Sequence, residues 1–175
     1  TKTKSDTEVI VELFAKIGHN CFNLLDGMFS VAIFDKKECN LHLSRDVFGI
    51  KPLYYSLKNK KLNFCSEIKG IIGQKSNFKQ NDKNIINFIK WGGLDHSSET
   101  WYKGIKNVKP GTILTIKKNF SIFEKQYYSF SNNVKKTEIN RTNIPFKFKK
   151  LLEKSVKDQS QTIRSIGTNL SGGVD

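Results

Sequence analysis

The sequence has 175 residues, of which 37% are hydrophobic and 11% aromatic, which is enough for a packed core and argues against a chain disordered throughout. Its formal charge of +14 suggests nucleic-acid binding, but the lysines occur singly and in pairs along the whole chain. A nucleic-acid module would gather them on one face, interleaved with exposed aromatic side chains. We therefore consider a nucleic-acid partner unlikely on composition and pattern alone.

Other features of the composition narrow the class of protein further. No apolar run approaches the ~20 residues that span a bilayer, and no secretory leader is recognisable, so we expect a cytoplasmic protein without a membrane partner. The cysteines Cys21, Cys39 and Cys65 lack metal-type spacing, and the three histidines are scattered. We predict no metal site built from protein side chains alone.

The first predicted element is a helix over residues 7–17. Residues 5–8 read Ser-Asp-Thr-Glu, a capping box with Ser5 as N-cap and Glu8 three residues later. Apolar residues then recur at helical spacing until Gly18 ends the helix. A carboxylate such as Asp6 in the first turn suits the helix dipole, which is a sufficient explanation of Asp6 when the helix is taken alone.

The middle of the chain alternates short apolar runs with polar turns, which predicts antiparallel sheet flanked by helices, an α+β pattern. The strands are expected at 28–35, 41–44, 53–56, 62–65, 112–117 and 122–128, and the helices at 68–72 and 82–90. The run 28–35 is almost entirely apolar, so we expect both of its faces to be covered. In the helix 82–90 we expect Ile85, Ile86 and Ile89 to form the buried face.

Residues 129–143 are polar and show little periodicity, and we interpret them as an inter-domain linker. Beyond them Pro145 can begin a helix at its first turn. The pattern of that helix places Phe148, Leu151 and Val156 on one face and lysines on the other. Residues 163–170 are then expected to form a strand that leads into the end of the chain.

The last six residues read Leu-Ser-Gly-Gly-Val-Asp and suggest a phosphate-binding turn. Adjacent glycines allow backbone N–H groups to approach an anion closely. Ser171 adds a hydroxyl, and Asp175 adds a carboxylate able to hold a divalent cation on phosphate oxygens. A helix, a strand and a phosphate turn in this order are typical of the opening of a nucleotide-binding α/β domain. Taken alone, the turn is weak evidence for a phosphate site, and a polar loop after a strand is the simpler interpretation.

Read together, these motifs resemble the glutamine-hydrolysing asparagine synthetases, and they occur in that family's order over nearly the whole chain. The resemblant stretches are 5–10, 27–29, 45–55, 66–69, 99–105, 110–111, 127–128 and 170–175. Each stretch is a weak signal by itself, whereas the ordered set is specific.

The resemblance implies a two-domain enzyme, a carbon–nitrogen ligase with glutamine as amido donor. Residues 1–128 would be the C-terminal part of a glutaminase domain, an N-terminal-nucleophile hydrolase with α/β/β/α layers. Residues 129–143 would be the linker, and 144–175 the first helix and strand of an ATP-pyrophosphatase domain. Ammonia from glutamine would attack a β-aspartyl-adenylate, giving asparagine, glutamate, AMP and pyrophosphate. Glutamine, aspartate and ATP would be the small-molecule partners and Mg²⁺ a cofactor, with a homodimer left open.

Carried over by position, Asp6 matches the family aspartate that holds the α-amino group of glutamine. The residues that match the ATP pyrophosphate loop are Leu170, Ser171, Gly172, Gly173 and Asp175, the last as a magnesium ligand. A further family signature matches Arg45, Asp46, Gly49, Lys51 and Pro52. We expect these five residues to shape the sheet edge and to take no part in the chemistry.

The sequence departs from the family at the nucleophile. The family uses the cysteine at the mature N-terminus, whereas Thr1 here stands just before the capping box, and none of the three cysteines occupies that place in the motif order. We therefore assign no catalytic residue and predict that this central fragment of the enzyme is inactive alone. The alternatives are a related amidotransferase with a sugar or β-lactam type acceptor and, from another class, a basic nucleic-acid-binding module.

Overall fold

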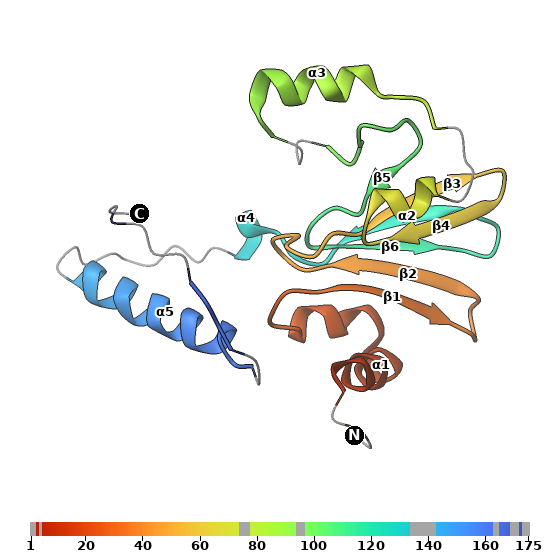
Figure 1. The fold of residues 1–175 in the computed structure, drawn as a ribbon. Coiled ribbons are helices and arrows are strands. Elements are labelled where there is room, and N and C mark those ends of the chain that lie inside the picture. Colours follow the sequence, from red (N-terminus) through yellow and green to blue (C-terminus); the bar gives the residue numbers. More distant parts are fainter. Residues whose placement is uncertain are drawn as a thin grey trace. The chain divides into compact units, whose positions relative to one another are not determined.

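The computed structural model describes residues 3, 5–73, 78–93, 97–133, 143–162, 165–168 and 172. The chain divides into two compact units, Thr1–Asn133 and Val134–Asp175. Figure 1 shows the first unit as two antiparallel sheets with helices beside them. In the described part of the chain, no helix combines the length and apolarity needed to cross a membrane.

Two sheets form the centre of the first unit. The larger has four strands in the order β1-β2-β6-β7, and the smaller has three in the order β4-β3-β5. Their bounds are β1 Ser30–Asp35, β2 Asn40–Arg45, β3 Tyr54–Lys58, β4 Lys61–Cys65, β5 Lys106–Asn107, β6 Thr112–Ile116 and β7 Ile122–Gln126. Every neighbouring pair is antiparallel, and Tyr54 of β3 lies opposite both Cys65 and Asn107. The two-residue strand β5 was not predicted.

The helices are distributed along both units. They are α1 Asp6–Ile17, the 3₁₀ helix η1 Gly18–Leu24, α2 Ile68–Ile72, α3 Asp82–Trp91, α4 Phe130–Asn133 and, in the second unit, α5 Ile144–Gln159. The prediction of α1 is confirmed, with Ser5 as N-cap: its Oγ accepts from the Thr7 N–H at 3.3 Å. The predicted capping box is incomplete, because the Glu8 carboxylate accepts from the backbone N–H of Thr3 at 2.5 Å.

Two apolar clusters separate the layers of the first unit. One lies between the sheets and contains Leu43 of β2, Tyr55 of β3 and Leu114 of β6. The other lies between the larger sheet and the α1–η1 segment, with Phe22 and Ile113 fully buried. Adjacent strand residues point to opposite faces, so Ile113 and Leu114 let β6 contribute to both clusters. Burial of each such side chain contributes roughly 1.5–3 kcal/mol.

The short helix α2 forms the outer layer on the smaller sheet. It contacts β3 and β4, and its Ile71 is 1% exposed. The order helix, sheet, sheet, helix confirms the predicted α+β class with α/β/β/α layers (Figure 1).

The expectation of two covered faces on the first strand was wrong. β1 is the edge strand of the larger sheet, and its side chains alternate between half-buried and exposed, with Phe34 59% exposed. Val31 and Ile33 pack against the cluster that contains Phe22, whereas Ala32 and Phe34 point to the opposite face and are exposed, so only one face of β1 is covered.

The predicted buried face of α3 was also wrong. Ile85 is only half-buried, and Ile86 and Ile89 are 49% and 75% exposed. Instead, the Phe88 ring lies 5.2 Å from the Trp101 ring, and the Asn84 side-chain amide donates to the Glu99 carbonyl at 2.6 Å. The helix is therefore held to the loop at 99–101 by an aromatic contact and amide hydrogen bonds, which an apolar periodicity does not predict.

In the second unit, α5 begins with Pro145 in its first turn, as predicted, but none of its residues is buried. Phe148 and Leu151 on the predicted apolar face are 65% and 67% exposed. The predicted strand 163–170 is described only at 165–168, and these four residues form no strand. A strand requires a paired neighbour, and the described residues of this unit contain none. Most of the predicted linker, residues 134–142, lies outside the described residues.

Candidate functional site

Asp6 is the first residue of α1, and its side chain is exposed. Among the described residues, none forms a hydrogen bond or an ion pair with its carboxylate. The N-terminal N–H groups of the helix favour negative charge at this position. An ionised carboxylate with unused acceptor positions can bind an ammonium group, which is the chemistry that the sequence predicts for Asp6.

The structure places only one residue of the predicted ATP loop. Gly172 lies in an exposed bend, and a Cβ added to it would have no neighbour within 4 Å. Leu170, Ser171, Gly173 and Asp175 lie outside the described residues. The assignments of ATP and Mg²⁺ therefore remain predictions.

The carboxylate of Asp46 is a buried hydrogen-bond acceptor at the end of β2. Its side chain is 1% exposed and accepts four backbone N–H groups. Oδ1 accepts from Ile50 at 2.9 Å and Phe48 at 3.1 Å, and Oδ2 accepts from Lys51 at 3.0 Å and Phe29 at 3.2 Å. This carboxylate thereby fixes the loop after β2 and ties it to the segment just before β1.

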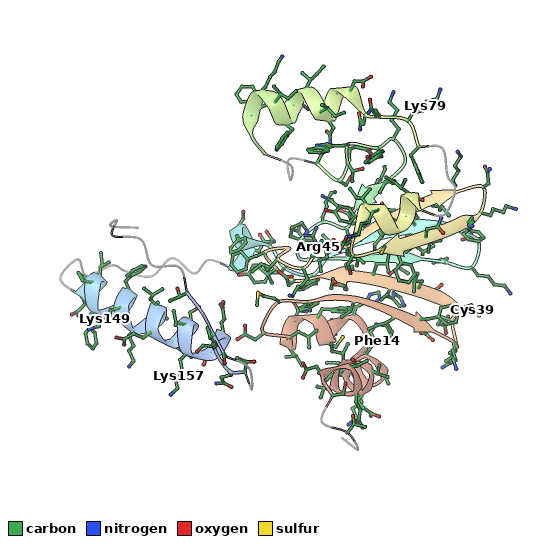
Figure 2. The ribbon with its side chains drawn as sticks, viewed as in Figure 1. Phe14, Cys39, Arg45, Lys79, Lys149 and Lys157 are labelled. Atoms are coloured by element: carbon green, nitrogen blue, oxygen red, sulfur yellow. The ribbon has the colours of Figure 1, made fainter. Side chains whose placement is uncertain are left out.

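Arg45, which is labelled in Figure 2, holds the same loop through its guanidinium group. Its guanidinium donates to the carbonyls of Lys51 and Val108, both at 2.8 Å, and to that of Gly49. The Tyr127 hydroxyl donates to the Arg45 carbonyl at 2.7 Å. Burial, with a further contribution from Asp46, raises the pKa of Tyr127 and keeps this hydroxyl a donor.

The charged groups of Arg45 and Asp46 are thus both used inside the protein. The guanidinium of Arg45 is directed at carbonyls, and the carboxylate of Asp46 at backbone N–H groups. The structural role expected for them agrees with this geometry, because neither group is presented to a substrate.

The side chains of Pro110 and Arg45 lie close to the backbone of Gly49, so Gly49→Ala should destabilise the first unit. Its φ is +65°, and an added Cβ would lie 2.7 Å from Pro110 Cγ and 2.9 Å from Arg45 Nη2. The left-handed conformation and the clash together should cost about 2–4 kcal/mol in free energy of unfolding, measured by urea denaturation.

The matched control for that substitution is Gly104→Ala. Gly104 also has a positive φ, +85°, but no atom lies within 4 Å of its added Cβ. Only the conformational cost of about 1 kcal/mol remains. Equal losses at Gly49 and Gly104 would show that the loop does not pack as described.

The cysteines lie at three unrelated places. Cys21 in η1 is fully buried, and that burial raises the pKa of its thiol, which disfavours the nucleophilic thiolate. Cys39 lies in the exposed β1–β2 turn (Figure 2), and Cys65 ends β4 beside Gly70. Within the described ranges, no group of three or more His, Cys, Asp or Glu side chains could hold a metal ion.

Sequence reasoning missed a pair of histidines. His19 of η1 and His42 of β2 lie 3.0 Å apart, from Nε2 to Nδ1. The alternation of β2 was the available signal, since it turns His42 toward the helical layer, but no spacing in the sequence indicates that His19 meets it there.

Comparisons with known proteins identify the protein family of this chain. Residues 1–128 match the family model described as a glutamine amidotransferase domain. A putative glutamine-hydrolysing asparagine synthetase 2 of Methanocaldococcus jannaschii is 33% identical over 177 residues, which cover 100% of this chain and 34% of that protein. Asparagine synthetase 2 of Bacillus subtilis is 33% identical over 186 residues, covering 99% of this chain and 25% of the relative.

A solved structure of glutamine phosphoribosylpyrophosphate amidotransferase from B. subtilis is 20% identical, with a TM-score of 0.47, over 73% of this chain and 24% of that one. The chain belongs to the glutamine amidotransferase domain family. Its resemblance to the glutamine-hydrolysing asparagine synthetases is confirmed by relatives that match it from end to end. The chain spans between a quarter and a third of the length of these relatives.

Proposed function

We propose that the protein containing this chain transfers the amide nitrogen of glutamine to aspartate activated by ATP. The products are asparagine, glutamate, AMP and pyrophosphate. One observation carries the proposal: the match to asparagine synthetases covers all of this chain, whereas the amidotransferase domain covers residues 1–128 only. A protein that merely released ammonia would have no need of the matching segment beyond residue 128.

In this reaction Asp6 binds the α-amino group of glutamine. The supporting observation is an exposed carboxylate at a helix N-terminus that no described residue engages. The ammonium of glutamine would pair with this carboxylate and fix the substrate by the end opposite its amide, so that the amide is presented for hydrolysis.

The terminal turn binds ATP in the same proposal. Backbone N–H groups of Gly172 and Gly173 and the Ser171 hydroxyl would hold the phosphates, with Leu170 beside the nucleotide. Asp175 would hold the magnesium ion that accompanies them. ATP supplies the leaving group that a carboxylate substrate lacks. Synthesis from aspartate, glutamine and ATP suits the cytoplasmic location that the sequence predicts.

The described residues offer no glutaminase nucleophile in this scheme. Cys21 is buried with a raised pKa, Cys39 lies in the β1–β2 turn, and Cys65 lies at the end of β4. None of them stands at the N-terminal position where the chain's own amino group could serve as the base. We expect the 175 residues alone to release no ammonia from glutamine.

Asp175→Asn tests the ATP half of the proposal. In the full-length protein the substitution should lower aspartate-dependent pyrophosphate release at least ~100-fold, because an amide is a poor magnesium ligand. Hydrolysis of glutamine to glutamate should persist, since Asp6 is untouched. Unchanged pyrophosphate release would exclude Asp175 from the metal site, and Ser165→Ala, outside the turn motif, serves as the control.

A further inference from the structure

The histidine pair joins two layers of the first unit. His19 comes directly after the Gly18 cap of α1, while His42 lies in the middle of the larger sheet, 5% exposed. Their nitrogens are 3.0 Å apart, and the rings meet edge to face with centroids 4.7 Å apart. Nδ1 of His42 also lies 3.0 Å from the Thr115 hydroxyl of β6.

The geometry sets a limit on protonation. A hydrogen bond between two imidazole nitrogens needs one N–H and one bare nitrogen, so at least one ring must be neutral. The Thr115 hydroxyl accommodates either arrangement, because it can donate or accept. If both rings are protonated, two N–H groups face each other across 3.0 Å, and two like charges lie together in a half-buried site.

The charged surroundings do not compensate fully for a second proton. Burial, and then the charge of Lys125 of β7, lowers the pKa of His19. Burial and then His19 lower the pKa of His42, while Asp35 at the end of β1 opposes that shift. Both histidines also border a cavity of about 640 Å³, which is lined by three further charged residues, Lys36, Lys37 and Glu38.

The ring of Phe14 on α1 packs against both histidine rings. Its centroid lies 5.1 Å from that of His42 and 5.9 Å from that of His19. Phe14 also packs into the cluster that holds α1 and η1 on the sheet (Figure 2). Separating the two histidines therefore disturbs the same contacts that position α1, the helix that begins with Asp6.

We propose that the His19–His42 pair is a proton-operated latch, closed when at least one ring is neutral and opened by a second proton, which releases α1 from the sheet. The effect of opening on glutamine rests on the proposed function of Asp6. The latch is then an acid switch on glutamine use.

The sign of the effect follows from the direction of the shifts. Both pKa values lie below the ordinary 6.5 of histidine, so near that pH the unfolded chain binds more protons than the folded one. The stabilisation is fully present above pH 6.5 and is lost as the pH falls through the interval down to the lowered pKa values.

Hydrogen exchange of the full-length protein between pH 7.5 and 5.0 tests the latch. After correction for intrinsic rates, amides of residues 6–24 should exchange faster at pH 5.0 than at pH 7.5. The expected factor is about tenfold for each unit by which the histidine pKa is lower in the folded than in the unfolded chain. Amides of β2 and β6 should change little. His19→Gln keeps a donor and an acceptor but removes one charge, and should abolish this acceleration. Thr115→Val, which leaves both histidines, should retain it.

Equal acceleration in wild type and His19→Gln would overturn the latch. Should His19→Gln fail to fold, the two imidazoles of the wild type are followed by NMR: coupled titration below pH 6.5 supports the latch, and independent titration near 6.5 refutes it. Exchange needs no catalytic turnover, so these outcomes are separate from those of the proposed function. If exchange behaves as expected but glutamine is not a substrate, the latch stands and the role given to Asp6 fails.

Discussion

Replacement of Asp46 by asparagine should lower the free energy of unfolding of the first unit by about 3–5 kcal/mol. The carboxylate is buried and accepts four N–H groups, two on each oxygen. Asparagine retains one carbonyl oxygen and turns an NH₂ group toward the other two donors. Each of those donors then loses a hydrogen bond to a charged acceptor, worth about 1.5–3 kcal/mol. Urea denaturation followed by tryptophan fluorescence measures the loss, since Trp91 and Trp101 both lie in this unit.

Asp35→Asn is the matched control for this prediction. The Asp35 carboxylate also accepts backbone N–H groups, from Lys37 at 2.9 Å and Glu38 at 3.2 Å, but both bonds use Oδ1 and lie in an exposed turn. An asparagine oxygen and water can replace them, so the cost should stay near ~0.5 kcal/mol. Comparable losses at positions 35 and 46 would refute the organising role of Asp46.

Asp6→Ala should reduce kcat/KM for glutamine about 100-fold or more while sparing synthesis from added ammonia. Loss of one partner of a substrate ion pair costs ~2–5 kcal/mol, and each ~1.4 kcal/mol is tenfold. The fold should survive, because a carboxylate in the first turn of a helix contributes only about 0.3–1 kcal/mol. Steady-state assays of asparagine formation with glutamine or ammonium chloride as nitrogen donor measure the two activities.

Glu12→Ala provides the comparison within the same helix. Glu12 is exposed on α1, away from its N-terminus, and no role in substrate binding is assigned to it. Its removal should leave both activities within about twofold, as for a surface substitution. If Asp6→Ala lowers the glutamine and ammonia activities equally, the residue does not hold glutamine.

The parts of the fold that are encoded locally were predictable from the sequence. Ser5 and Gly18 mark the two ends of α1, and the structure uses both as caps. The β3–β4 hairpin was also predicted, and its turn residues Asn59 and Lys60 both adopt positive φ, 51° and 57°. Such features depend on backbone geometry over a few residues, which a single stretch of sequence specifies.

Features that depend on distant partners were not predictable. Phe34 and Ile89 are exposed because no other described element packs over them. The periodicity of apolar residues within one element carries no information about its neighbours. The Lys106–Asn107 strand exists because Tyr54 and Tyr55 lie opposite it. Likewise, the sequence signature identified Asp46, but only the folded loop shows that its carboxylate binds four N–H groups.

Asp6 was selected by family resemblance, since at a helix N-terminus a carboxylate is explained equally well by the dipole. The structure shows that Asp6 is exposed at the start of α1. The contact between His19 and His42 was not predictable, because the alternation of β2 orients only His42 and the contact joins residues 23 positions apart across two layers.

The most direct measurement of the central claim follows a labelled nitrogen atom. The full-length protein is incubated with ATP, aspartate, Mg²⁺ and glutamine labelled with ¹⁵N in the amide, and the products are analysed by mass spectrometry. The account predicts labelled asparagine together with AMP and pyrophosphate. Consumption of ATP without label in asparagine, or no reaction of glutamine at all, would contradict it.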